Sequence, residues 1–312
     1  MSRVMLAARP NDYSQVARAA LSLAALALVA TACGKQQDEV HGDTSTTVTT
    51  TNVDSGLVTS TGIPANVSFA EAESVYNGRR YGEAAAMFET YVQRKPDNAY
   101  GHYMLGLSAW KAGELDRARS AFERSLELDA KHVKTLLNLS RVLIEQGKPR
   151  DALTHVTTAV QLDSTSGEVH RMMGRVRTEL RQPNEAVESY RLALSLQPTD
   201  VWSMNNMALV LIQQERFDEA LPPLARAVQL DSSVASFHNN LGIVLERTGH
   251  YTMAAESYRK ALSVDSSYSK ATSSLARVEQ RVDDPSVSPI NLTELAETFD
   301  REIRTSVVVR QP

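Results

Sequence analysis

Apolar residues recur at helical spacing through most of the chain, from Ala65 to about Tyr268. Each block of the pattern contains two such runs, separated by a short turn that often holds a glycine. One block shows the first run in Leu105, Ala109 and Ala112 and the second in Ala118, Phe122 and Leu126. The pattern therefore predicts pairs of antiparallel helices joined by tight turns.

The helical pairs repeat every 34 residues without an insertion. One dipeptide position recurs at Leu105-Gly106, Leu139-Ser140, Met173-Gly174, Met207-Ala208 and Leu241-Gly242, and an alanine position at Ala84, Ala118, Ala152, Ala186, Ala220 and Ala254. A fixed period in this range is typical of proteins built from stacked repeats. Six consecutive hairpins are thus predicted between residues 65 and 268.

Small residues in the first helices are matched by large residues in the second helices. Gly106, Gly174 and Gly242 share their blocks with Phe122, Tyr190 and Tyr258, whereas Ser140 and Ala208 share theirs with the smaller Val156 and Leu224. Close helix crossings need a small residue on one side and a filler on the other. The alternation predicts one close crossing in each of these hairpins.

These blocks resemble tetratricopeptide repeats. The sixth block carries the motif as Leu241-Gly242, Gly249, Tyr251, Ala254, Tyr258 and Ala261, and Pro96 and Pro198 close the first and fourth blocks. The resemblance implies an all-α fold, a right-handed superhelical solenoid of about six hairpins with a capping helix. It also implies that the first helices line a concave groove.

The resemblance places a set of candidate partner-binding residues in that groove, where a protein or peptide is expected to bind. The set comprises Tyr103, Trp110, Asn138, Arg141, Arg171, Arg175, Trp202, Asn205, Asn206, Asn239 and Asn240. Asn138, Asn206 and Asn240 share one repeat position, so they are candidates for a ladder that grips peptide backbone. The alternative is that these amides satisfy neighbouring turns.

Three histidines, His102, His170 and His238, lie at the same place in alternate repeats. Three imidazoles suggest a metal site, but stacked helices lie about 8–10 Å apart and each repeat adds two of them. Side chains two repeats apart are then too distant to share one ion. We therefore interpret these histidines as packing residues, and we predict neither a metal nor another cofactor.

The sequence contains no catalytic motif, phosphate-binding loop or spare cysteine, so an enzyme is not indicated. No small-molecule substrate is suggested either. The net charge is -4 and there is no basic run, which argues against nucleic acid as a partner.

The N-terminus has the pattern of a secretory signal peptide, residues 1–32. Arg3, Arg9 and Arg18 precede an apolar segment at 19–32 that is too short to span a bilayer. Cys33, the only cysteine, follows the segment directly and resembles the lipid-attachment site of bacterial lipoproteins. That resemblance implies a palmitate-type anchor at Cys33; the alternative is ordinary cleavage at the same bond. Because Gly34 follows instead of Asp, the expected location is the outer membrane, facing the periplasm.

Residues 33–64 are polar and rich in threonine, with no spacing that would bury a face. We predict a disordered linker that tethers the repeat array, residues 65–282, to the membrane.

Two irregularities fall near the fifth repeat. Pro222-Pro223 lie inside a second helix and should kink or restart it, and Arg181 and Glu215 replace the turn glycine of their repeats. A local distortion of the array is expected there.

The C-terminal part is predicted to hold three features. Residues 269–282 match half a repeat and should form the capping helix. After breaks at Asp283-Asp284-Pro285 and Pro289, Asn291 and Glu294 resemble a capping box that opens a last helix within 283–312. The helix carries one apolar stripe, Leu292, Leu295, Phe299 and Ile303. This stripe is expected to dock on the array or to wait for a partner; the remaining alternative is a frayed helix, because helices this short are marginal alone. Val307-Val308-Val309 is predicted to form a short strand-like tail.

The sequence as a whole predicts a non-enzymatic scaffold, a lipid-anchored envelope protein that helps to assemble a pilus-like or secretin-like complex. The alternative is an adaptor that serves an envelope protease or a glycan-modifying enzyme.

Overall fold

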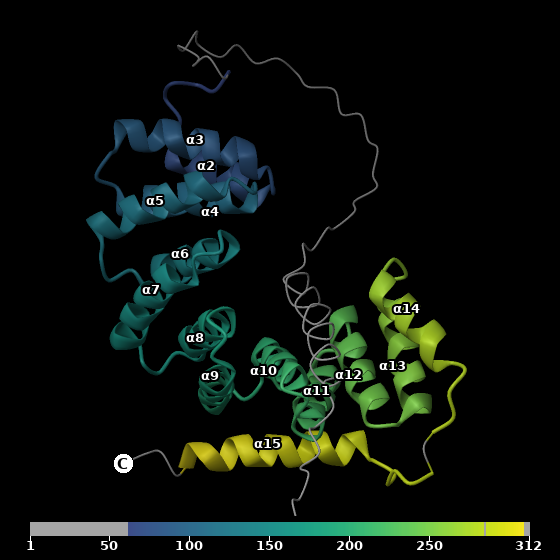
Figure 1. The fold of residues 1–312 in the computed structure, drawn as a ribbon. Coiled ribbons are helices and arrows are strands. Elements are labelled where there is room, and N and C mark those ends of the chain that lie inside the picture. The colour runs from purple at the N-terminus through teal and green to yellow at the C-terminus, as the bar shows by residue number, and fades with distance from the viewer. Residues whose placement is uncertain (1–61, 284, 309–312) are drawn as a thin grey trace, which may run out of the picture. The chain divides into compact units, whose positions relative to one another are not determined.

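A computed structural model describes residues 62–283 and 285–308, and within these ranges every regular element is an α-helix (Figure 1). The fourteen helices of the described part are α2 (Phe69–Asn77), α3 (Tyr81–Arg94), α4 (Ala99–Lys111), α5 (Leu115–Leu128), α6 (Val133–Glu145), α7 (Pro149–Leu162), α8 (Gly167–Glu179), α9 (Pro183–Leu196), α10 (Val201–Gln213), α11 (Phe217–Leu230), α12 (Ala235–Arg247), α13 (Tyr251–Val264), α14 (Ser269–Val278) and α15 (Leu292–Val308). The all-α prediction is confirmed.

The 34-residue period of the sequence is also the period of the structure. The first helices from α4 to α12 each have 13 residues, and the second helices from α3 to α13 each have 14. Helix α14 begins where a seventh first helix would begin, so it continues the register as predicted for the capping helix. The six predicted hairpins are therefore present, from α2–α3 to α12–α13.

Contacts between repeats distinguish the two sets of helices. Each first helix packs against the first helix of the next repeat, from α2 with α4 to α12 with α14. Within the described residues, no two second helices make a comparable contact. The first helices therefore form the inner, more closely spaced layer of the array, and the second helices form the outer layer.

The predicted close crossings are present. A Cβ atom added to Gly106, Gly174 or Gly242 would lie 2.6 Å from the ring of Phe122, Tyr190 or Tyr258. These three rings are fully buried, as are Ser140 and Val156 in the intervening repeat. Each aromatic ring thus fills the space that its glycine leaves open, which keeps the core close-packed.

The fifth repeat keeps the register of its neighbours. Helix α11 runs without interruption from Phe217 to Leu230, with Pro222 and Pro223 inside it. The predicted restart is therefore wrong, and the predicted kink stays a prediction. The two prolines remove only two backbone donors, and the burial of Ala220 and Leu224 on the same helix holds it against the core.

The turns at Arg181 and Glu215 adopt the same backbone as the glycine turns. Gly147 has φ of 71°, and Arg181 and Glu215 have φ of 58° and 59°. This left-handed conformation is unfavourable for a residue with a Cβ atom. The hairpin geometry is thus imposed on these two residues by the packed helices around them.

The last helix docks on its own array, which is the first of the three alternatives predicted. The Asn291 side chain accepts hydrogen bonds from the backbone N–H groups of Thr293, at 3.1 Å, and Glu294, at 3.3 Å, and so caps α15. Ala296, Phe299 and Ile303 are buried, and α15 packs against the second helices α9 and α11 along the outer layer (Figure 1).

The C-terminal tail differs from the prediction. Helix α15 continues to Val308, so a strand-like conformation at Val307-Val308 is wrong. Valine disfavours a helix only slightly, and a helix that is already docked extends through it. Val309 lies outside the described residues.

The predicted signal peptide, Cys33 and most of the predicted linker also lie outside the described residues. Ile63 and Val67 are buried in the core of the first repeats, so the packed part of the chain includes Ile63.

A reciprocal capping box between Ser68 and Glu71 starts α2. No helix in the described part is long and apolar enough to cross a bilayer.

Candidate functional site

All eleven predicted partner-binding residues lie on first helices, and hence in the inner layer of the array. Helix α4 carries Tyr103 and Trp110, α6 carries Asn138 and Arg141, α8 carries Arg171 and Arg175, α10 carries Trp202, Asn205 and Asn206, and α12 carries Asn239 and Asn240. Side-chain contacts join most of them into two polar groups.

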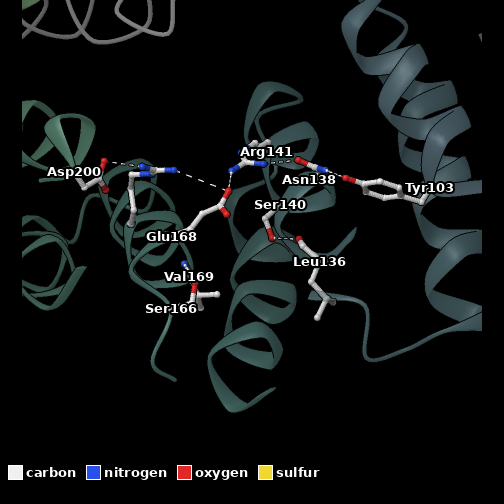
Figure 2. A network of polar contacts seen from close by, with 10 residues as sticks. Tyr103, Leu136, Asn138, Ser140, Arg141, Ser166, Glu168, Val169 and Asp200 are labelled. Atoms are coloured by element: carbon white, nitrogen blue, oxygen red, sulfur yellow. Dashed lines mark hydrogen bonds and ion pairs between the residues drawn. The ribbon is translucent and has the colours of Figure 1, made fainter. Parts of the chain in front are cut away.

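The first group begins with a row of side chains on α4, α6 and α8 (Figure 2). Asn138 donates a hydrogen bond to the Tyr103 hydroxyl at 3.3 Å and accepts one from the Arg141 guanidinium. Arg141 in turn donates to the Glu168 carboxylate at 2.6 Å. The row therefore connects three consecutive repeats through their first helices.

The row continues from α8 to α10 through Arg171. One guanidinium nitrogen of Arg171 lies 4.0 Å from Glu168, and another donates to Asp200 at 2.7 Å. Asp200 is buried at the N-cap of α10 and also accepts a hydrogen bond from the Ser203 hydroxyl at 2.6 Å. A carboxylate at this position is stabilised by the helix dipole as well as by its partners.

We call Arg141, Arg171 and Arg175, with Glu168 and Asp200, the arginine cluster. Burial lowers the pKa of Arg141, the hydrogen bond and charge of Glu168 oppose that effect, and the positive charges of Arg175 and Arg171 lower the pKa further. The guanidinium stays charged, because its pKa begins far above neutrality. The three cations are thus close enough to repel one another in a partly desolvated place.

The second group consists of asparagine amides on α10 and α12. Asn240 donates to the Asn205 carbonyl oxygen at 2.8 Å, and Asn239 donates to the Asn240 carbonyl oxygen at 3.3 Å. Asn205 donates to Asn206 at 3.4 Å. The amides of Asn205 and Asn240 are thus engaged with each other across the repeat boundary, whereas Asn138 belongs to the first group.

Asn239 and Asn206 of the second group differ in their exposure to solvent. The Asn239 side chain is 2% exposed, and its carbonyl oxygen is buried without a hydrogen-bond partner. Asn206 is only half-buried. The ladder predicted for Asn138, Asn206 and Asn240 remains a prediction, and Asn206 is the member most accessible to a ligand.

Aromatic side chains are exposed on either side of the arginine cluster along the chain. Trp202 on α10 is 48% exposed, and its ring packs edge-on against Phe237 at 5.1 Å. Tyr100 on α4 is 50% exposed and stacks on Tyr103 with 5.5 Å between ring centroids. An exposed aromatic ring held by a buried neighbour is a rigid contact surface.

Trp110 is placed differently from Trp202. It is half-buried, and its indole N–H donates to the two carboxylate oxygens of Glu145 at 3.0 and 3.1 Å. The Lys111 ammonium lies 4.9 Å from the centre of its ring. The indole is therefore fixed in place by the next repeat.

The three periodic histidines hold the loops that precede their helices. The Nε2 atoms of His102, His170 and His238 lie 3.0, 2.8 and 3.0 Å from the backbone carbonyl oxygens of Pro96, Ser164 and Ser232. Each histidine thus bridges to the loop six residues earlier, which confirms a structural role. No cluster of three metal-ligating side chains occurs among the described residues.

Glu168 and Asp200 were not predicted as site residues. Both lie at the start of a first helix, where an acidic residue reads as an ordinary helix cap. The sequence signal for them is an arginine on one first helix followed, in the next repeat, by an acidic residue at the start of the first helix. Arg141 on α6 pairs in this way with Glu168, and Arg171 on α8 pairs with Asp200.

Models of one family match the chain over its whole repeat region. Four tetratricopeptide repeat models match residues 69–132, 109–176, 169–200 and 199–267. The chain belongs to the tetratricopeptide repeat proteins. Among curated proteins none matches it.

Several solved tetratricopeptide-type structures have a similar fold. PilW, a type IV pilus biogenesis factor, has 15% sequence identity and a TM-score of 0.61, covering 68% of this chain and 98% of its own. PilF of Pseudomonas aeruginosa has 19% identity and a TM-score of 0.53, covering 70% of this chain and 91% of its own. The Cut9–Hcn1 complex has 16% identity and a TM-score of 0.58, covering 77% of this chain and 46% of its own. At these identities the likeness shows the fold alone.

Proposed function

We propose that this tetratricopeptide repeat protein is a non-enzymatic scaffold whose inner layer of first helices binds a segment of a protein partner. The observation that carries the proposal is the composition of that layer. Exposed Tyr100 and Trp202 flank charged and amide side chains, although aromatic residues of this size are normally buried. Aromatic and arginine side chains are the residues that contribute most to protein–protein affinity.

The proposed setting is the cell envelope, with the chain anchored through a lipid at Cys33 in the outer membrane and facing the periplasm. The support for this part is the signal-like segment that ends at Cys33. The fold shared with PilW, a type IV pilus biogenesis factor, supports a role in assembling a pilus-like or secretin-like complex. An envelope anchor would hold the inner layer within reach of such a complex.

The scaffold role can be tested by co-purification of the full chain from detergent extracts. We expect a pilus or secretin subunit to be recovered with the wild-type chain, and to be recovered several-fold less with Trp202→Ala. The matched control is Glu256→Ala, because Glu256 is exposed on α13 in the outer layer. Recovery of a hydrolase or transferase instead would support an adaptor role, and equal recovery with all three chains would contradict binding through the inner layer.

The anchor has a separate test. Metabolic labelling with a fatty-acid analogue should label the wild-type chain and leave Cys33→Ala unlabelled. Equal labelling of both chains, or of neither, would contradict lipid attachment at Cys33.

A further inference from the structure

We propose that the C-terminal segment is a strap that fixes the arrangement of repeats four to six. The strap consists of helix α15 with residues 279–283 and 285–291 before it, and α15 packs on the outer layer of the array. Its effect on the array is independent of the proposed function. Its effect on a partner rests on that function, because repeats five and six carry Trp202 and Asn240 in the inner layer.

The second helices of the array are not held to one another directly. Each packs on the first helix of its own repeat and on that of the next, and within the described residues only the first helices contact their counterparts in neighbouring repeats. In a solenoid each repeat contacts only its neighbours, so small rotations at successive interfaces add up to a change of curvature. Such rotations alter the separation of the second helices most, because these lie far from the contacts between first helices.

Helix α15 joins two second helices that belong to different repeats. It packs against α11 of repeat five and α9 of repeat four (Figure 1). Neighbouring second helices are two helix spacings apart, roughly 16–20 Å, and a 17-residue helix is about 25 Å long. One helix is therefore long enough to bridge the pair.

The burial of side chains on α9 differs from that on a second helix outside the strap. Leu194 on α9 is fully buried, whereas the equivalent Leu126 on α5 is half-buried. Ser195 on α9 is 9% exposed, whereas the equivalent Glu127 on α5 is exposed. Leu194 and Phe299 of α15 belong to one apolar cluster. The strap therefore extends the apolar core over the C-terminal half of α9.

An ion pair fixes α15 where it packs on α11. Arg226 of α11 donates to one carboxylate oxygen of Asp300 at 2.9 Å, and Arg304 donates to the other at 2.7 Å. The side chains of Arg226 and Asp300 are only 16% and 19% exposed, so water and salt screen this pair less than a surface pair. The ion pair thus specifies one position of α15 along α11, which apolar contact alone would leave less defined.

Polar contacts fasten the residues before α15 to repeat six. The Asp283 carboxylate accepts a hydrogen bond from the backbone N–H of Thr252 at 2.7 Å. The Nε2 atom of His250 lies 3.1 Å from the backbone carbonyl oxygen of Ser288. His250 and Thr252 lie at the start of α13, the second helix of repeat six. The strap therefore contacts three successive repeats, and it connects repeats four and six, which a simple solenoid leaves unconnected.

The repeat boundaries that the strap spans also carry polar contacts of the inner layer. Arg171 and Asp200 join repeats four and five, and Asn205 and Asn240 join repeats five and six. Hydrogen bonds weaken steeply when the separation or angle of the two groups changes. A fixed separation of the second helices therefore preserves the arrangement of the inner side chains, including Trp202, that a partner would contact.

The test measures distances between nitroxide spin labels in the full chain by double electron–electron resonance, in a Cys33→Ser background. One pair of labels, at Glu188→Cys and Glu256→Cys, spans repeats four to six. The control pair, at Ser120→Cys and Glu188→Cys, spans repeats two to four. The three labelled residues are exposed and occupy the same position in their repeats, so the pairs differ only in whether the strap crosses them.

The strap is weakened in two ways and restored in one. Asp300→Arg places a second positive charge beside Arg226, and Phe299→Ala removes the apolar anchor. The double variant Arg226→Asp with Asp300→Arg reverses the ion pair and should restore it. Glu302→Arg is the matched control, because it makes the same change of charge at an exposed position of α15.

We expect a narrow distance distribution between residues 188 and 256 in the wild-type chain and in Glu302→Arg. The distribution should become about twofold wider in Asp300→Arg and Phe299→Ala, because repeats four to six then rotate independently. It should return to the wild-type width in the double variant. Restoration cannot result from misfolding, so the double variant keeps the test decisive. The distribution between residues 120 and 188 should stay unchanged throughout.

Three results would overturn the strap. They are the same distribution between residues 188 and 256 in the wild-type chain and both weakened variants, equal widening for both pairs of labels, and no restoration in the double variant.

Recovery of the partner by co-purification is the second readout. Asp300→Arg should reduce recovery several-fold and the double variant should restore it, although α15 and α11 do not belong to the inner layer. Wild-type recovery with Asp300→Arg, together with a widened distribution, would overturn the link between the strap and the partner. If the wild-type chain recovered no partner, the proposed function would fail, and the distances would still decide whether the strap exists.

Discussion

At the scale of single residues, the array depends on pairs of small and large side chains at each helix crossing. The glycine of the pair has no Cβ atom, and the aromatic ring of the second helix occupies that volume. The pairing could be predicted from the sequence because it recurs at the repeat period. Glycine–aromatic pairs alternate with serine–valine pairs, so the combined volume of the two side chains is kept from repeat to repeat although the residue types change.

The Gly174→Ala substitution tests this packing directly. A Cβ atom at residue 174 would lie 2.6 Å from the Tyr190 ring, and the ring is fully buried. We expect a loss of about 1–3 kcal/mol in the free energy of unfolding, measured by urea denaturation, since overpacking forces neighbours out of place. Gly82→Ala is the control, because nothing lies within 4 Å of its added Cβ atom. It should be neutral or stabilising in the helix; equal losses from both variants would contradict the packing account.

At the turn of Glu215, a substitution by glycine is expected to stabilise the protein. Its φ of 59° places a residue with a Cβ atom in the left-handed region, and its side chain is exposed. Glu215→Gly should therefore stabilise the protein by about 1 kcal/mol, and Gly147→Ala at an equivalent turn should destabilise it by a similar amount. Thermal unfolding of the two variants checks the signs, and a destabilising Glu215→Gly would show that the left-handed turn costs nothing.

At the scale of elements, the last helix covers a part of the outer layer that is unusually apolar. Helix α11 packs against α15, and its Leu221 and Ala225 are buried, whereas the equivalent positions of α5 carry Arg119 and Glu123. An ion pair between Arg226 and Asp300, at 2.9 Å, joins the two helices. The docked arrangement explains why the apolar stripe of α15 needs no partner from outside the chain.

Release of α15 is expected when its central anchor is removed. Phe299 is 6% exposed, and Phe299→Ala should cost about 3 kcal/mol, which exceeds what a short isolated helix can withstand. Hydrogen exchange at the amides of residues 295–305 should then become much faster while α4 stays protected. Glu302→Ala is the control, because Glu302 is exposed on the same helix. Unchanged protection of α15 in Phe299→Ala would contradict the docking.

The sequence predicted elements better than it predicted contacts. The period determined where each helix begins, and the capping pattern at Asn291 predicted the start of α15. The restart at Pro222-Pro223 was wrong, because a local backbone preference was outweighed by burial along the rest of α11. The acidic partners of Arg141 and Arg171, which are Glu168 and Asp200, could not be assigned from the sequence. Each pair joins residues of neighbouring repeats that are about 30 positions apart in the chain, and the sequence does not show which of their side chains face each other.

At the scale of the whole molecule, the inner and outer layers of the array differ in the side chains that they expose. The outer layer is closed by α15 over part of its surface and carries exposed ion pairs elsewhere, such as Arg119–Glu123. The inner layer has exposed aromatic rings, partly buried arginines and a buried carbonyl oxygen, on Asn239, that has no partner within the described chain. Exposed aromatic rings beside an unsatisfied buried acceptor favour a layer that is completed by another molecule.

The most direct test of this account is site-specific photocrosslinking in cells, with a photoreactive amino acid in place of Trp202 in the inner layer or of Glu256 in the outer layer. Both positions are exposed, so their intrinsic chance of contact with other proteins is similar. The account predicts a discrete crosslinked protein from residue 202, competed by excess unmodified chain, and no such product from residue 256. The same product from both positions, or a product from residue 256 alone, would contradict a partner bound by the first helices.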